Sequence, residues 1–398
     1  MAASKSFRYT LFALLYFAQG AIMSYFTALN AVYLLSFDVS LTQIGLMGAI
    51  ALIPFVLKIF MGMLSDRVNL LGFGHRKPYI IIGLLIQAVC LVIVPTINPA
   101  QNFALFALLG FLLMAGMALY DTCTDGLALD TTSPEEQGTV QGFMVGGRAL
   151  GVVVLSAVIG LIAQHSSWAV MFYTLAGLSL LPLLLVLGAR EAPRPAERKF
   201  EWGAFKAFAN KSIIALGLLG ALYSLIINGA NQIVNPFMQA EFDISVSTAG
   251  FLTTAWGIGV VLGGLSGGRL VDRFGQNRAV WVALTIAGVS ILALAGIVAP
   301  WLAWPLIILF GLAFGYYETV YFAISMRASD PRIAASMFSI LMAVANIGTG
   351  IGLALSGAMV DSLGYRLTFI IIALLNLLAL PLMPLIFTQK TAHVLQEA

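Results

Sequence analysis

Long runs of apolar residues, separated by short polar segments, recur along the whole chain. Within each run the apolar positions are continuous, without the every-second-residue alternation that is typical of a half-buried strand. Each run is long enough to cross the ~30 Å hydrocarbon core of a bilayer as a helix, which takes about 20 residues. The pattern therefore predicts twelve membrane-spanning helices. Their expected ranges are 9–36, 41–66, 78–97, 102–129, 138–164, 167–189, 212–239, 246–271, 279–299, 303–327, 334–360 and 366–388.

The composition supports a membrane protein and excludes an ordinary soluble domain. Of the 398 residues, 60% are hydrophobic and 9% are charged, whereas soluble domains carry roughly 25% charged residues. Only helices and closed barrels satisfy every backbone hydrogen bond in lipid, and the continuous runs favour helices. Cys90 and Cys123 stand in no metal-ligand or disulfide pattern, so we expect no metal and no cofactor.

The distribution of basic residues predicts the orientation of the chain. Lysine and arginine gather in the terminal segments and in every second loop, and among the opposite loops only Arg366 is basic. By the positive-inside rule both termini are cytoplasmic, which requires an even number of spans. The first run is too long for the core of a signal peptide, so we expect it to be retained. The expected location is a bacterial inner membrane.

One long polar stretch, residues 190–211, divides the chain. It contains Pro193 and Pro195 among interspersed charged residues, a composition typical of a linker. We therefore predict an N-terminal six-helix bundle over residues 1–189 and a C-terminal six-helix bundle over residues 212–398.

The two halves share sequence landmarks. The skeleton Gly-x-Leu-x-Asp-Arg occurs at Gly62 to Arg67 and again 206 residues later, at Gly268 to Arg273. At an offset of 197 residues, Tyr120-Asp121-Thr122 falls on Tyr317-Glu318-Thr319, and Gly160 falls on Gly357. The repeated skeleton resembles the loop between helices 2 and 3 of major facilitator superfamily transporters. That resemblance implies two pseudo-symmetric bundles of six helices each, an all-α membrane fold.

The repeated loop is a candidate cytoplasmic gate. A glycine near a helix end permits close helix approach, and an Asp-Arg pair can hold helix ends together in one conformation and release them in another. A basic loop that only sets topology is the alternative. The candidate gate residues are Gly62, Asp66, Arg67, Arg76, Gly268, Asp272, Arg273 and Arg278.

Five ionisable residues stand inside the apolar runs: Lys58, Asp121, Asp125, Arg148 and Glu318. Each costs at least ~2.5 kcal/mol at membrane depth, so each is a functional candidate. Asp121 and Asp125 are four residues apart and share one helix face, for which Arg148 is the expected counter-ion. Glu318 is the counterpart of Asp121 in the second half. The residue that corresponds there to Arg148 is Ala345, which cannot serve as a counter-ion. We therefore expect Glu318 to take up the coupled proton, with Asp121 as second candidate, although purely structural roles stay open for the acids and for Lys58.

An amide stripe occupies one face of the helix expected at 212–239. Its members follow helical spacing, so they should face a water-filled cavity rather than lipid, unless they serve helix packing. The candidate substrate-cavity residues are Asn228, Asn231, Gln232 and Asn235 of this stripe, Gln19 and Asn30 of the first helix, and the aromatic residues Trp256, Tyr317 and Tyr321.

Residues 16–151 resemble, more narrowly, the family of muropeptide permeases and acetyl-CoA transporters. The resemblance is carried by Tyr16 to Gly20, by Leu57-Lys58, by Phe73 to Lys77, by Asp121-x3-Asp125 and by Gly147-Arg148. It implies import driven by a proton gradient. The loop also resembles that of glycoside and sucrose symporters, and Phe60 to Met63 follows the general superfamily pattern.

The function predicted from these observations is proton-coupled symport of a polar or amphipathic organic solute by alternating access. An exporter, a facilitator, or a carrier-fold protein that does not transport, such as a pigment-assembly factor or sensor, remains the alternative. The sequence carries no phosphate-binding loop and no nucleophile constellation, so we do not expect an enzyme. The expected partners are a small-molecule substrate, protons and lipid, with no nucleic acid, and the expected state is a monomer.

Overall fold

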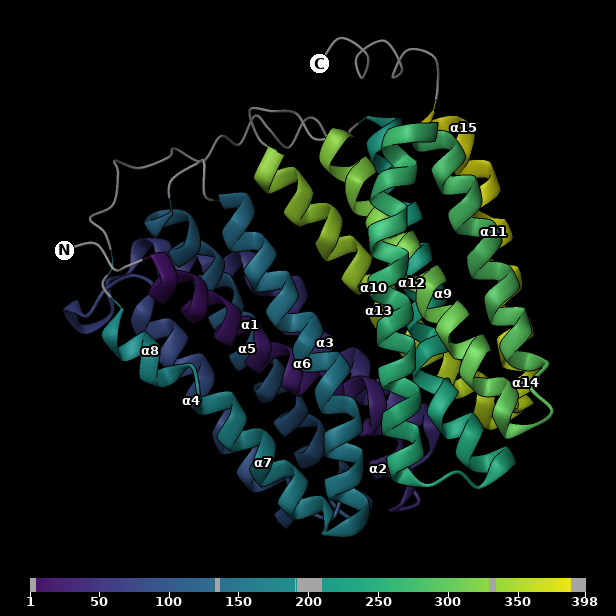
Figure 1. The fold of residues 1–398 in the computed structure, drawn as a ribbon, viewed down its shortest axis with the longest axis horizontal. Helices are drawn as coiled ribbons and strands as arrows, with labels where there is room; N and C mark the ends of the chain where they lie inside the picture. The colour runs from purple at the N-terminus through teal and green to yellow at the C-terminus, as the bar shows by residue number, and fades with distance from the viewer. Residues whose placement is uncertain (1–4, 133–136, 190, 192–209, 329–333, 388–398) are drawn as a thin grey trace. The chain divides into compact units, whose positions relative to one another are not determined.

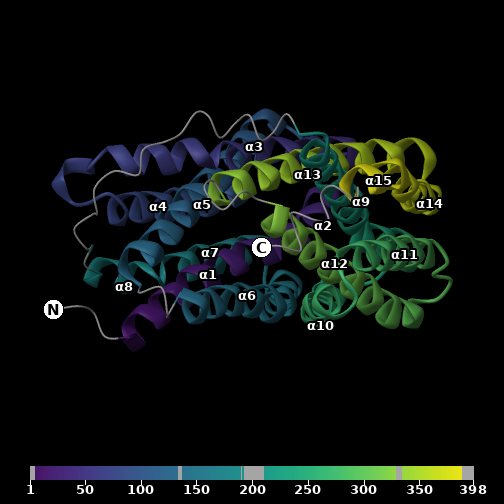
Figure 2. The ribbon, with the colours of Figure 1, turned by 90° about the horizontal axis from the view of Figure 1, so that it is seen from above.

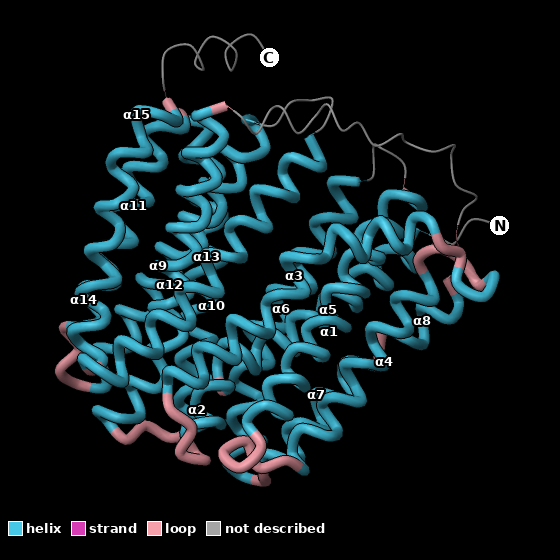
Figure 3. The backbone as a smooth tube through the Cα atoms, turned by 180° about the vertical axis from the view of Figure 1, so that it is seen from behind, coloured by secondary structure: helices cyan, strands magenta, loops and turns pink. Residues whose placement is uncertain are grey.

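The computed structural model describes residues 5–132, 137–189, 191, 210–328 and 334–387. Within these ranges the ordered elements are helices joined by short loops, and there is no strand (Figure 3). The described residues contain twelve segments that are long and apolar enough to cross a membrane. The predicted all-helical membrane fold is therefore confirmed.

The helices form two compact units. The first comprises Met1–Val39, Ile50–Ala196 and Ile244–Thr254, and the second comprises Ser40–Ala49, Glu197–Asp243 and Ala255–Ala398. Two helices thus begin in one unit and continue in the other: α3 (Leu41–Arg67) and α10 (Val246–Phe274).

In the first unit, α1 packs along α6, and α4 packs along α5 and α7 (Figure 1). Glycines bring α1 and α6 into backbone contact: a Cβ at Gly20 would lie 2.2 Å from the Arg148 carbonyl oxygen, and one at Gly147 would lie 2.3 Å from that of Ala13. Besides α3, the helices of this half of the chain are α1 (Lys5–Ala28), α2 (Asn30–Leu35), α4 (Lys77–Ile93), α5 (Phe103–Thr131), α6 (Gln137–His165), α7 (Trp168–Leu180) and α8 (Leu183–Gly188).

The second unit repeats this packing. α9 lies along α13, and α11 lies beside α12 and α14 (Figure 2). Gly348, which is 197 residues after Gly151, sits where a Cβ would be 2.0 Å from the Ala221 carbonyl oxygen. Besides α10, the helices are α9 (Lys211–Phe242), α11 (Gln276–Ala295), α12 (Pro300–Ala328), α13 (Ala334–Leu363), α14 (Tyr365–Leu375) and α15 (Met383–Ile386).

Three helices expected to be continuous are interrupted. The span predicted over 9–36 breaks at Leu29, and the span predicted over 167–189 breaks at Leu181-Pro182. The last span passes through a 3-10 segment, Asn376–Leu382, that contains Pro381. A proline stands at the second break and within the third segment, and each lacks the backbone N–H that an α-helix would use there. Pro236, by contrast, lies inside α9 without ending it.

Candidate functional site

A cluster of charged and polar side chains is buried between helices of the first unit. Asp121 of α5 is only 5% exposed. The Lys58 Nζ of α3 lies 3.5 Å from Asp121 Oδ2, and the Gln19 amide of α1 donates a hydrogen bond of 3.0 Å to Asp121 Oδ1. Three helices therefore meet at one carboxylate.

Asp125 lies one turn further along α5 and has a different environment. The Tyr16 hydroxyl of α1 donates a hydrogen bond to Asp125 Oδ1. Arg148 of α6 interacts electrostatically with both Asp125 and Tyr16. Arg148 was expected to be the counter-ion of both acids. In the structure Lys58 forms the ion pair with Asp121, and Arg148 interacts with Asp125. Tyr16 was not among the candidates, although it stands in the first-helix motif, one turn before Gln19.

This arrangement, the acid cluster (Tyr16, Gln19, Lys58, Asp121, Asp125, Arg148), balances two carboxylates against two bases. Because the positive charges compensate the negative ones, a proton added to either acid leaves one base without its anionic partner. Burial makes such a change costly unless another group compensates it. The cluster can therefore link a protonation event to the rearrangement of its four helices or to the arrival of an anionic group.

Glu318 of α12 stands 197 residues after Asp121, at the equivalent position of the sequence repeat. It is half-buried and interacts electrostatically with Tyr223 of α9. The Tyr223 ring packs against Tyr317 and Tyr321, with ring centroids 5.1 Å and 4.8 Å apart. Tyr317 and Tyr321 are each 1% exposed, so their rings pack within the protein.

Two members of the amide stripe make contacts between helices. The Asn228 Nδ2 donates to the Thr349 hydroxyl at 3.2 Å, and the Gln232 Nε2 donates to the Leu353 carbonyl oxygen at 2.9 Å. Both acceptors belong to α13, which is the packing role left open by the sequence. Asn235 is buried and Asn231 is half-buried.

Two further cavity candidates belong to other helices. Asn30 of α2 is buried, and its Oδ1 has no hydrogen-bond partner among the described residues. Trp256 of α10 is 9% exposed and packs edge to face on Phe314, with centroids 5.0 Å apart.

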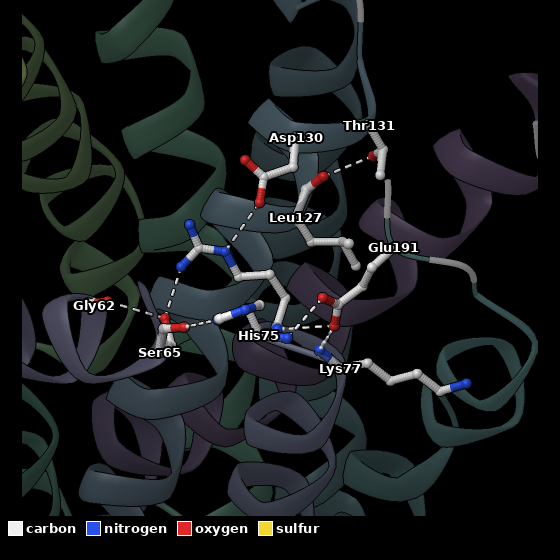
Figure 4. A network of polar contacts seen from close by, with 9 residues as sticks. Gly62, Ser65, His75, Lys77, Leu127, Asp130, Thr131 and Glu191 are labelled. Atoms are coloured by element: carbon white, nitrogen blue, oxygen red, sulfur yellow. Dashed lines mark hydrogen bonds and ion pairs between the residues drawn. The ribbon is translucent and has the colours of Figure 1, made fainter. Parts of the chain in front are cut away.

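A second network surrounds Arg76, in the loop between α3 and α4 (Figure 4). The Arg76 Nε donates to Asp130 Oδ2 of α5 at 3.1 Å, and its Nη1 donates to the Ser65 hydroxyl of α3 at 2.7 Å. His75 adds a contact of 3.1 Å between its Nδ1 and the Ser65 carbonyl oxygen. Arg76 is 8% exposed, so this candidate gate residue is a buried connector of two helix ends.

Glu191 fixes the backbone of the same loop. Its carboxylate accepts hydrogen bonds from three successive backbone N–H groups, those of His75 at 2.7 Å, Arg76 at 2.8 Å and Lys77 at 2.5 Å (Figure 4). These groups begin α4, and an acid is favourable there because the first N–H groups of a helix lack intrahelical partners. Sequence reasoning missed Glu191, which had been placed in the linker. Its one signal was an acid just after the last apolar run of the first half.

Two glycines make room for this network. A Cβ at Gly74 would lie 2.4 Å from Glu191 Oε1, and Gly74 has φ +126°. A Cβ at Gly126 of α5 would lie 2.4 Å from the Arg76 Cζ. Gly74 thus leaves space for the Glu191 carboxylate, and Gly126 leaves space for the Arg76 guanidinium. A Cβ at either glycine would occupy that space.

The other gate candidates are placed only in part. Gly62 faces Thr122, and Arg273 and Arg278 are exposed, with the Arg273 guanidinium 5.3 Å from the Phe274 ring centroid. The side chains of Asp66, Arg67 and Asp272, and the surroundings of Gly268, lie outside what the structure describes.

Comparison with models of protein families shows to which family the chain belongs. The model of the Major Facilitator Superfamily matches residues 11–230 and, again, residues 216–397. The chain belongs to the Major Facilitator Superfamily. It is an integral membrane protein with the fold of that superfamily's transporters, as the repeated loop predicted.

Individual relatives of this superfamily member are distant. Putative transporter AmpG 1 of Rickettsia conorii is 23% identical over 376 residues, which cover 85% of this chain and 88% of that protein. Sialic acid transporter NanX of Escherichia coli K12 is 24% identical over 236 residues, covering 56% of this chain and 54% of NanX. The match to NanX thus spans about half of that protein. The AmpG match supports the narrower resemblance to muropeptide permeases.

Solved structures agree on the fold. The crystal structure of a D-xylose-proton symporter superimposes with a TM-score of 0.76, at 17% identity, over 94% of this chain and 95% of that one. At this identity the likeness shows the fold alone.

Proposed function

We propose that this transporter is a symporter that couples proton entry to the import of a polar or amphipathic organic solute, by alternating access. The observation that carries the proposal is the acid cluster, in which Asp121 and Asp125 are held at membrane depth by groups from three other helices. Ionisable groups in such positions are costly and mark ion or substrate pathways. One superimposable structure is that of a D-xylose-proton symporter, which supports the proton as the coupling ion.

Glu318 is the proposed principal proton-coupling residue, with Asp121 as the second. Glu318 stands at the position of the repeat that Asp121 holds in the first half, and it is half-buried beside Tyr223. Asp121 forms an ion pair with Lys58 at 3.5 Å, so its proposed protonation would also release the Lys58 ammonium.

The cluster residues Asp125, Arg148 and Lys58 are proposed to transmit protonation to helix movement. Substrate contact is proposed for the amides and aromatic residues of the two units: Gln19, Asn30, Asn228, Asn231, Gln232, Asn235, Trp256, Tyr317 and Tyr321. Amide side chains both donate and accept hydrogen bonds, so they suit a solute that carries hydroxyl, amide or carboxylate groups.

The proposed setting is a bacterial inner membrane, with a monomeric protein whose two termini are cytoplasmic. In this orientation the Arg76 network lies at the cytoplasmic rim and acts as part of the gate. The basic residues of the loops support this orientation through the positive-inside rule.

Uptake into proteoliposomes tests the proposal. Sialic acid, D-xylose and a muropeptide are offered with the outside acidic and the inside alkaline. The symporter should accumulate at least one of them, and a protonophore should abolish the accumulation. Uptake that ignores the gradient would indicate a facilitator instead, and accumulation only under the reversed gradient would indicate an exporter.

A further inference from the structure

We propose that Asp361 is a clasp that holds the first turn of α3 on the last turn of α13, within the second unit. The Thr42 backbone N–H donates to Asp361 Oδ2 at 2.7 Å, and the Thr42 hydroxyl donates to the same oxygen at 2.6 Å. The Leu41 N–H lies 3.3 Å from Asp361 Oδ1. One carboxylate thus receives three donors from a helix start that is about 320 residues away in sequence.

The local sequence of α3 leaves these donors available. Ser40 and Gln43 cap each other: the Ser40 N–H donates to Gln43 Oε1 at 3.2 Å, and the Gln43 N–H donates to Ser40 Oγ at 3.3 Å. This reciprocal pair is a capping box, which serves the N-cap and the third helical position. The N–H groups between them, of Leu41 and Thr42, have no intrahelical partner, and Asp361 supplies it from another helix.

The two helices approach closely where the clasp forms. A Cβ at Gly357 of α13 would lie 2.0 Å from the Leu41 carbonyl oxygen, and a Cβ at Gly45 of α3 would lie 2.1 Å from that of Leu353. Backbone thus faces backbone, with no interdigitated side chains at these glycines. The charge-assisted hydrogen bonds of Asp361 add directional contacts at this end of the crossing.

The duplicated half contains a neutral version of the same device. Gln164 stands 197 residues before Asp361, and Gly160 stands 197 residues before Gly357. In the first unit the Gln164 Oε1 accepts a hydrogen bond of 2.8 Å from the Ser247 N–H at the start of α10. A Cβ at Gly160 would lie 3.1 Å from the Val246 carbonyl oxygen. The repeat therefore keeps a side-chain acceptor at this position, but the acceptor is neutral and receives one hydrogen bond in place of three.

The clasp restrains one end of α3. α3 continues into the first unit at Ile50, so the clasp fastens one end of a helix whose other end belongs elsewhere. Under the proposed alternating access, α3 must leave α13 whenever this end opens, and Asp361 sets how often that happens. The role of the clasp in alternating access rests on the proposed function. The clasp itself can be measured without transport.

The test uses Leu41→Cys as a reporter. Leu41 is 3% exposed at the clasp, and the native Cys90 and Cys123 are both buried. The protein in nanodiscs, where both faces are accessible, is treated with a hydrophilic maleimide, and labelling of the parent without the reporter is subtracted. Asp361→Ala should raise the labelling rate several-fold, and Asp361→Asn should raise it less, since the amide oxygen still accepts one hydrogen bond.

Ser362→Ala is the matched control, because Ser362 is exposed and, among the described residues, its hydroxyl bonds within its own helix, to the Ala358 and Met359 carbonyl oxygens. It should label at the parental rate. An unchanged rate in Asp361→Ala, or an equal rise in Ser362→Ala, overturns the clasp. Asp361→Asn decides the question by the same criterion if Asp361→Ala does not purify as a monodisperse protein. A transporter that fails the proton-gradient test leaves this measurement intact.

Discussion

The Lys58 ammonium lies 3.5 Å from the Asp121 carboxylate, yet the two partners differ in exposure: the Lys58 side chain is 34% exposed and that of Asp121 is 7% exposed. Removing the ammonium leaves a carboxylate that water cannot reach, whereas removing the carboxylate leaves an ammonium that can extend toward water. The two ends of this ion pair are therefore not equivalent for stability.

This asymmetry predicts that Lys58→Gln lowers the melting temperature more than Asp121→Asn does. The double variant should recover part of the loss seen in Lys58→Gln, because no unpaired charge remains. Thermal unfolding in detergent, followed by intrinsic fluorescence, measures all three. Equal losses in the two single variants, with no recovery in the double, would show that the pair contributes nothing specific.

Removing the Tyr16 hydroxyl should impair transport while leaving the fold intact. Tyr16→Phe keeps the buried ring but deletes the donor to Asp125, and a hydrogen bond to a charged group contributes about 1.5–3 kcal/mol. We expect initial uptake rates to fall by roughly tenfold or more. Tyr9→Phe, in the same helix, is the control, because the Tyr9 ring stacks on Phe143 with centroids 5.0 Å apart and would keep that contact. If both variants transport equally well, the Tyr16–Asp125 bond has no role in the cycle.

A methyl group at Gly74 should disrupt the seat of Glu191. Gly74→Ala adds a Cβ 2.4 Å from the carboxylate at a backbone φ of +126°, so it combines a clash with strain. Gly72→Ala is the matched control, since Gly72 also has positive φ, +77°, but a Cβ there meets nothing within 4 Å. We expect the melting temperature to fall clearly further in Gly74→Ala. Comparable melting temperatures in the two variants would mean that only backbone strain destabilises the protein. The Glu191 carboxylate would then move away from the added methyl group at no cost.

Gly126→Ala should displace the Arg76 guanidinium from Asp130 and Ser65. The added Cβ would lie 2.4 Å from the Arg76 Cζ, whereas in Gly110→Ala of the same helix it would meet nothing within 4 Å. Because alanine favours a helix over glycine by about 1 kcal/mol, Gly110→Ala should be neutral or slightly stabilising. Gly126→Ala should lower both stability and uptake. Uptake at the parental rate in Gly126→Ala would remove Arg76 from the proposed gate.

The helical fold followed from the sequence because lipid leaves a continuous apolar run few other conformations. The glycine contacts between helices also left a signal, since Gly160 and Gly357 hold equal places in the repeat and both lie at helix crossings. Helix interruptions were harder to predict, because Pro236 lies within α9 whereas Pro182 coincides with a break between α7 and α8. A proline removes one donor in every case, and the neighbouring helices decide whether the span continues.

The sequence predicted most residues of the candidate site, but not which of them contact one another. The sequence predicts Asp121 and Lys58 as charges at membrane depth, but which base meets which acid depends on helix rotation, and Lys58 rather than Arg148 pairs with Asp121. Glu191 and Asp361 act on the first turns of helices far away in sequence. Such caps depend on tertiary approach and leave no local capping pattern at the acid itself.

Proton coupling through Glu318 is the central claim, and one comparison tests it most directly. Wild type and Glu318→Gln are reconstituted side by side, and two assays are run with whichever solute the wild type accumulates: accumulation driven by a pH gradient, and exchange of labelled for unlabelled solute without any gradient. Glu318→Gln should retain exchange, because the neutral amide mimics the protonated acid, and should lose accumulation. Gradient-driven accumulation at the wild-type level in Glu318→Gln would contradict proton coupling through this residue.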